Sequence, residues 1–200
     1  MKERVILDLS KLATQATGTS SPTWWGTLAF MLIEGTGFAL GVVIYLYLMS
    51  LAPEWPIRAP LPDLGPGVLV TGLFVASLVP NLFLAHWAKD KKKTKVRVGL
   101  LVLTTLSLVL LAIRAFEFRA MNVSWDTNAY GSVVWLLLGL HTTHILTEVI
   151  ETAVLTWLMF TRHGKNARRF ADVGDNAMYW NFVVATWIPI YFCIYWIPRL

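Results

Sequence analysis

Five stretches of the chain are long and apolar enough to cross a membrane as helices. They run from Trp24 to Leu51, from about Gly67 to Trp87, from about Val96 to Phe118, from Asn128 to Phe160 and from about Ala177 to Ile197. At about 1.5 Å of rise per residue, each can span about 30 Å of hydrocarbon. The pattern predicts an all-α fold, a polytopic membrane helix bundle with five transmembrane helices.

One polar stripe interrupts the apolar pattern of the fourth stretch. His141, His144, Glu148 and Glu151 fall within about 80° of one another on a helix that turns by roughly 100° per residue. Ionisable groups are costly in hydrocarbon and normally face protein or a water-filled cavity. We therefore expect the stripe to turn into the bundle and to find partners on other helices.

The first stretch carries one acid, Glu34, midway between the aromatic pairs near its two ends. Its position predicts a depth near the bilayer midplane, similar to that of His144. Because the first and fourth stretches run in opposite directions, Glu34 and His144 can meet. Two interpretations stay open: a buried pair that serves a proton or a lipid headgroup, or a hydrogen-bonded pair that only fixes helix packing.

Metal and haem sites are the next alternatives for the histidines. His141 and His144, followed by two glutamates, have a spacing compatible with zinc or di-iron, but the chain offers no second ExxH motif on another helix. A haem held by two histidines needs them on facing spans, and His86 and His163 lie at a span end and in a connection. We therefore expect no catalytic centre, metal or haem in this chain.

Three charged residues gather at the outer end of the third stretch: Arg114, Glu117 and Arg119. Arg114 and Glu117 lie three residues apart, which predicts an intrahelical ion pair. At the membrane interface such a pair contributes little stability.

Composition supports a membrane protein with one domain. The 200 residues are 56% hydrophobic and 14% charged, whereas soluble domains carry about 25% charged residues. Residues 24–200 would form the five-helix domain, and residues 1–23 a polar tail without the apolar core of a signal peptide. Cys193 is the single cysteine, so the chain has no disulfide framework.

The basic residues predict the orientation. Thirteen Lys and Arg lie in the tail and in the connections after the second and fourth stretches, against three on the opposite side, Arg58, Arg119 and Arg199. Positive residues concentrate on the cytoplasmic side. We therefore expect a cytoplasmic N-terminus and an external C-terminus.

Four motifs, taken in order, resemble the subunit III family of haem–copper oxidases. They are TWWGTLAFMLIEGTGF, AFEF, GLHTTHI and YWNFVVATWIPIYFCIYW. The resemblance puts the family's membrane glutamate on Glu34, its Glu-Phe pair on Glu117 and Phe118, and its two histidines on His141 and His144. It also implies packing roles for five further residues: Trp24, Trp25, Trp180, Asn181 and Trp187.

The chain departs from the family pattern at several positions. Asn181 stands where the family usually has His, Val184 where it has Asp, and Arg114 where it has Glu or Gln. Glu148 and Glu151 are not part of the usual pattern. The five spans resemble the short bacterial form of the family, which lacks the two N-terminal helices of the seven-helix version, and the departures resemble those of a divergent member.

The resemblance implies a non-catalytic accessory subunit of an aerobic terminal oxidase in the bacterial inner membrane. Such a subunit binds catalytic subunit I and other oxidase subunits, which carry the haem and copper, holds phospholipid and supports proton uptake. Two alternatives stay open: a homologue associated with nitric oxide reductase, and an independent membrane transporter or metal-binding protein. The electron donor, cytochrome c or quinol, is likewise open.

Overall fold

The structure is a computed structural model, and it describes residues 21–200, without the side chains of His163 and Lys165. The predicted tail falls outside these residues except for its last three positions. The helices are α1 (Pro22–Leu51), α2 (Leu64–Lys89), α3 (Lys93–Arg119), α4 (Ala129–Phe160) and α5 (Ala167–Tyr191). Short turns of 3₁₀ or π helix follow α4 and α5: η2 (Arg162–Lys165), η3 (Phe192–Trp196) and η4 (Ile197–Arg199). Residues 21–200 contain no strand, and five helices are long and apolar enough to cross a membrane, so the predicted fold class is confirmed.

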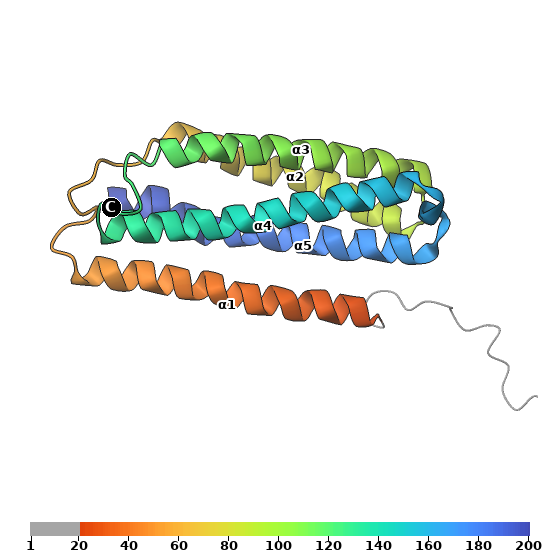
Figure 1. The fold of residues 1–200 in the computed structure, drawn as a ribbon, viewed down its shortest axis with the longest axis horizontal. Coiled ribbons are helices and arrows are strands. Elements are labelled where there is room, and N and C mark those ends of the chain that lie inside the picture. The colour runs from red at the N-terminus through yellow and green to blue at the C-terminus, as the bar shows by residue number, and fades with distance from the viewer. Residues whose placement is uncertain (1–20) are drawn as a thin grey trace, which may run out of the picture.

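The helices form a bundle in which α4 and α5 are central (Figure 1). On one side α1 lies along α4 and α5, and on the other α2 and α3 cover them. A core of aromatic and branched side chains fills the space between α2, α4 and α5. Helix α4, which carries the polar stripe, therefore has neighbouring helices on both sides.

The start of α5 was predicted wrongly. The last span was expected to begin near Ala177, whereas α5 begins at Ala167, where the Asn166 side chain accepts a hydrogen bond from the Arg168 amide. The first ten residues include four charged side chains, Arg168, Arg169, Asp172 and Asp175, so that in the sequence this stretch resembles a connection. In the structure Phe170 and Val173 pack into the core at this end of the bundle.

Close helix approach occurs at two of the three glycines in the middle of α1. A Cβ atom at Gly41 would lie 2.8 Å from Leu137 of α4, and one at Gly35 would lie 3.5 Å from Phe182 of α5. At Gly37 a Cβ atom would meet none of the described atoms within 4 Å. Gly41 and Gly35 therefore face neighbouring helices, whereas Gly37 does not.

The α2–α3 connection concentrates positive charge at one end of the bundle. Asp90 is its acidic residue, and a hydrogen bond from Lys92 Nζ, 2.6 Å away, holds the pKa of the Asp90 carboxyl below its ordinary value. The adjacent lysines stay exposed. This end matches the basic side that the sequence predicts to be cytoplasmic.

Candidate functional site

Three of the four stripe residues of α4 are buried as expected. His141, His144 and Glu148 expose 8% or less of their surface, whereas Glu151 is exposed. The expectation is therefore wrong for Glu151. That carboxylate instead lines a cavity between α1, α4 and α5.

Glu34 and His144 are in contact, as the depth estimate predicted. His144 Nε2 lies 3.1 Å from Glu34 Oε1, and both side chains are largely buried. The Tyr179 hydroxyl of α5 donates a hydrogen bond of 2.7 Å to Glu34 Oε2. Phe38, one turn further along α1, covers the imidazole ring at a centroid distance of 4.7 Å. The pair therefore ties α1 to both central helices.

The geometry assigns one shared proton to this pair. His144 Nδ1 lies 2.6 Å from the Leu140 carbonyl, and a carbonyl oxygen only accepts, so Nδ1 carries a hydrogen. Without a further proton, lone pairs on Nε2 and on Glu34 Oε1 would face each other across 3.1 Å. One proton must lie between them, as imidazolium with carboxylate or as imidazole with carboxylic acid. Either form is neutral overall, which suits a site near the bilayer midplane.

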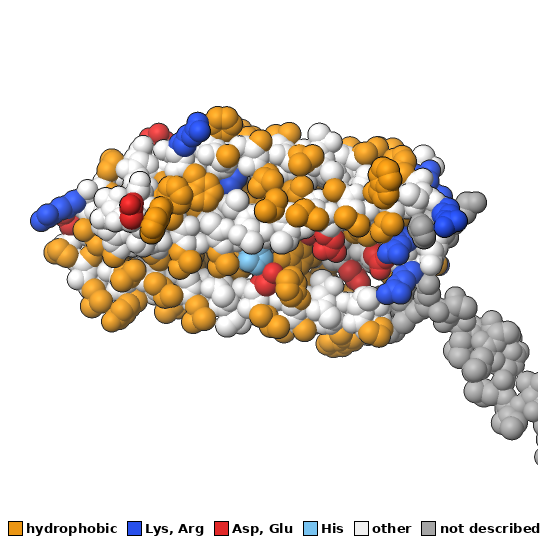
Figure 2. Space-filling model, viewed as in Figure 1, with side chains coloured by type: hydrophobic (Ala, Val, Ile, Leu, Met, Phe, Trp, Pro, Cys, Tyr) orange, Lys and Arg blue, Asp and Glu red, His pale blue; other side chains and the backbone are white. Residues whose placement is uncertain are grey.

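A cavity of about 380 Å³ opens beside the pair. Its lining residues are Gly26, Thr27, Phe30, Glu34, Thr147, Glu151, Asp175 and Tyr179. Figure 2 shows acidic side chains gathered in a hollow of this face, near a histidine and towards the end that bears Lys and Arg. The cavity thus connects the Glu34–His144 pair with a more polar part of the bundle.

Glu148 makes a second buried polar group next to the cavity. It accepts hydrogen bonds from Asn176 Nδ2 at 2.6 Å and from Thr152 Oγ1 at 3.2 Å. Its other oxygen, Oε2, has no hydrogen-bond partner within residues 21–200. The sequence did not single out Asn176, because this residue lies in the part of α5 that was predicted to be a connection.

Arg114 and Glu117 form an ion pair, but not the weak interfacial pair that was predicted. Arg114 Nη1 and Glu117 Oε2 are 2.5 Å apart, and both side chains are almost fully buried. The Tyr195 hydroxyl donates to Glu117 Oε1 at 2.6 Å, and the Arg114 guanidinium lies over the Trp187 ring at 4.0 Å. Burial makes this cluster a structural link between α3, α5 and η3, because a buried charge needs its partners.

Arg119 does not belong to that cluster. It is exposed at the end of α3 and lines a different pocket, with Arg58. The predicted grouping of three charged residues is therefore wrong for Arg119, since side chains five residues apart on a helix point in different directions.

His141 is locked in one neutral form by the buried cluster. Arg114 Nη2 lies 3.2 Å from His141 Nδ1, and arginine only donates, so Nδ1 accepts. His141 Nε2 lies 3.0 Å from the Val183 carbonyl and therefore donates. Both ring nitrogens of His141 are therefore engaged in hydrogen bonds within the bundle. The two histidines of the HxxH motif therefore belong to two separate hydrogen-bond networks.

The tryptophans of the family motifs divide into buried and peripheral ones. Trp180 donates to Ser77 Oγ and Trp187 to Thr71 Oγ1, both at 2.8 Å, which joins α5 to α2. Asn181 accepts from Asn81 Nδ2 at 2.9 Å along the same contact. Trp24 and Trp25 form an edge-to-face pair, 5.0 Å between centroids, at the start of α1.

The fold and this site define a multi-pass membrane helix bundle that holds buried ionisable pairs. The model of the family described as cytochrome c oxidase subunit III matches residues 23–198, and the chain belongs to this family. It is 26% identical over 180 residues to cytochrome c oxidase subunit 3 of Lumbricus terrestris, covering 86% of this chain and 69% of that protein. It is 24% identical over 177 residues to the subunit 3 of Synechocystis sp., covering 86% and 74%. For the subunit 3 of Mus musculus the identity is 28% over 182 residues, covering 86% and 68%.

Proposed function

We propose that this chain is the non-catalytic subunit III of a membrane haem–copper terminal oxidase, which couples oxygen reduction to proton translocation. The match to the family model over residues 23–198 carries the proposal. The contact of Glu34 with His144, on two positions that the resemblance singles out, supports it. The chain would associate with catalytic subunit I and other oxidase subunits.

Haem and copper belong to the partner subunits in this proposal. Both ring nitrogens of His141 are engaged, and His144 directs its nitrogens to Leu140 and Glu34. These contacts support the expectation that neither histidine binds a metal. The role of this chain is to stabilise subunit I and to keep it supplied with protons during turnover.

Phospholipid retention and proton uptake are the finer parts of the proposal. The cavity between α1, α4 and α5 gives a lipid headgroup or water access to Glu34. The proton shared by Glu34 and His144 is exchangeable between two buried groups, and Glu151 and Asp175 line the way towards the basic end. These features support a site that holds lipid and passes protons on the cytoplasmic side.

Purification of the chain with its natural partners tests the proposal. The complex extracted from membranes is expected to contain haem and copper and to consume oxygen. The isolated full-length chain is expected to carry neither metal nor haem. A stoichiometric, tightly bound transition metal on the isolated chain that disappears in His144→Ala would contradict it. Partners that reduce nitric oxide in place of oxygen would also contradict it.

We place the chain in the bacterial inner membrane with its basic end inside. Thirteen Lys and Arg in the tail and two connections, against three on the other side, support this orientation. In a Cys193→Ser background, an impermeant thiol reagent applied to intact cells is expected to label Asp126→Cys and to spare Lys92→Cys. Labelling of position 92 without position 126 would show that the chain has the opposite orientation.

A further inference from the structure

Helix α5 keeps one face exposed although it packs against α1, α2 and α4. Asn181, Ala185 and Pro189 follow one another at intervals of four residues, so they share one side of the helix, and all three are exposed. Asn181 contacts α2, whereas the neighbouring Phe182 lies against α1. The three residues, the exposed strip of α5, therefore lie between α1 and α2.

The exposed strip of α5 lies within the depth of the hydrocarbon. The Tyr179 hydroxyl bonds to Glu34, which the sequence places near the bilayer midplane. Asn181 is two residues further along α5, which puts it about 3 Å from that level. Pro189 is eight residues beyond Asn181, or about 12 Å, and half the hydrocarbon thickness is about 15 Å.

Asn181 brings an unsatisfied hydrogen-bond donor to this depth. Its Oδ1 accepts from Asn81 Nδ2 of α2 at 2.9 Å, which holds the amide in place. Its own Nδ2 carries two hydrogens, and no group within residues 21–200 accepts either of them. Hydrocarbon cannot accept them, so an exposed amide is costly at this depth. The acceptor has to come from outside the chain.

Pro189 leaves an unsatisfied acceptor one turn away. Proline has no N–H, so the Ala185 carbonyl loses the donor that the fourth following residue supplies in an α-helix. The exposed strip of α5 therefore offers a donor at Asn181 and an acceptor at Ala185, about 6 Å apart along the helix. The small side chain of Ala185 lets another helix approach closely.

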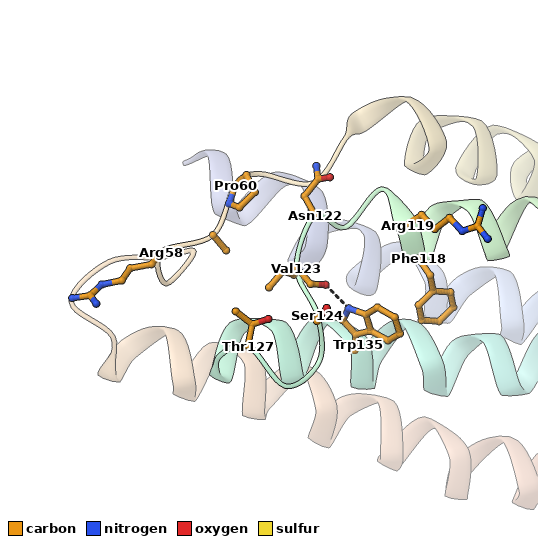
Figure 3. A pocket seen from close by; sticks show the side chains of 10 residues that line it. Arg58, Pro60, Phe118, Arg119, Asn122, Val123, Ser124, Thr127 and Trp135 are labelled. Atoms are coloured by element: carbon orange, nitrogen blue, oxygen red, sulfur yellow. Dashed lines mark hydrogen bonds between the residues drawn. The ribbon is translucent and has the colours of Figure 1, made fainter.

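Polar groups on other exposed faces are satisfied in ways that Asn181 is not. The hydroxyls of Thr36, Thr105 and Thr143 donate to carbonyls four residues earlier in their own helices, at 2.8, 2.9 and 3.0 Å. Arg58 and Arg119 point away from each other at opposite ends of a pocket of about 520 Å³ between two outer connections (Figure 3). Water can satisfy groups at the end of the bundle, whereas hydrocarbon cannot satisfy groups in its middle.

We propose that the exposed strip of α5 docks a transmembrane helix of another oxidase subunit. That helix presents an acceptor oxygen to Asn181 Nδ2 and a hydroxyl or amide donor to the Ala185 carbonyl. A phospholipid does not meet these needs, because its acyl chains have no hydrogen-bonding group and its headgroup stays at the membrane surface. The identity of the partner rests on the proposed function, whereas the face and its hydrogen-bonding groups come from the structure.

Photo-crosslinking in the native membrane tests which molecule covers this face. A benzophenone amino acid at Ile188, which is 56% exposed next to Pro189, is expected to couple to a membrane-spanning helix of a subunit that co-purifies with haem and copper. The same label at Leu146 of α4, which is 45% exposed, is the control and should couple mainly to lipid. Adducts of the Ile188 label with lipid alone, or with a second copy of this chain, would overturn the proposal.

Substitutions in the exposed strip of α5 test its contribution to assembly. Asn181→Leu is expected to weaken retention of the chain in the purified complex about three- to tenfold, the usual range for a hydrogen bond between membrane helices. Ala185→Phe should weaken it at least as much, because it blocks close approach and keeps every hydrogen bond of the chain. Thr143→Leu and Ala153→Phe make comparable changes at exposed positions of α4 and should leave retention unchanged. Equal losses from the α4 variants would contradict the proposed face.

The outcomes separate the docking face from the proposed function. A complex that contains haem and copper contradicts only the docking face if the Ile188 label couples to lipid alone and Ala185→Phe is retained like the parent. A complex that contains neither haem nor copper contradicts the proposed function together with the partner assigned here.

Discussion

Arg114→Ala is expected to lower the free energy of unfolding by about 3–5 kcal/mol, the usual cost of removing one partner of a buried ion pair. The substitution leaves the Glu117 carboxylate buried, with Tyr195 as its remaining donor. It also removes the donor to His141 Nδ1 and the cation over the Trp187 ring. Thermal unfolding of the purified complex and the amount of chain that it retains are the measurements.

Arg119→Ala is the matched control, because it removes the same side chain five residues further along α3 from an exposed position. It should change unfolding by no more than about 0.5 kcal/mol. Equal effects of Arg114→Ala and Arg119→Ala on the free energy of unfolding would show that the buried cluster adds no particular stability.

A double replacement separates charge burial from packing. Arg114→Met combined with Glu117→Leu removes both charges and keeps apolar volume, so it should cost less than the two alanine substitutions added together. The resemblance puts Arg114 at a position where the family usually has Glu or Gln. Its partners explain this departure, because the guanidinium neutralises Glu117 within the same helix and holds the tautomer of His141.

Glu34→Ala or His144→Ala is expected to cost roughly 1–3 kcal/mol, because each leaves a buried polar partner unsatisfied. The contact between α1 and the central helices should loosen, since Glu34 bonds to both His144 and Tyr179. Under the proposed function, the complex should then retain less phospholipid and sustain turnover for a shorter time. Haem spectra should stay normal, because the proposed function places the haem in the partner subunits.

Three comparisons sharpen this second prediction. Glu34→Gln keeps hydrogen-bonding atoms near His144 and Tyr179 and should be milder. Glu151→Ala, an exposed acid of the same cavity, should leave unfolding unchanged. The double alanine variant should lose less than the sum of the two single losses, because contacting residues are coupled. Strictly additive losses, or single variants that match the parent, would disprove the coupling.

Several features of this protein follow from its sequence alone. The five apolar stretches are each long enough for the membrane, and length with composition is sufficient to predict such helices. The depth of a residue along the membrane normal can also be estimated from the sequence. The aromatic residues at the span ends placed Glu34 level with His144, and the two side chains are in contact. The family motifs are likewise local, and the match over residues 23–198 agrees with them.

Other features depend on how each helix is rotated and what packs against it. The sequence shows that Arg114 and Glu117 are three residues apart. Their ion pair is buried because Tyr195 and Trp187 pack against it in the folded bundle. The partners of His141 come from α3 and α5, and its neutral form depends on both. Tyr179 bonds to Glu34 across 145 positions of the chain.

The cavity between α1, α4 and α5 is likewise a product of tertiary structure, since three helices far apart in the sequence bring Glu34, Glu151 and Tyr179 to its walls. The physical reason is common to these cases. Hydrophobic patterning determines which residues lie in the membrane and how deep they lie, because the bilayer acts along one axis. Helix rotation and neighbours are decided by packing and by the need to satisfy every buried polar group at once, which only the assembled bundle can do.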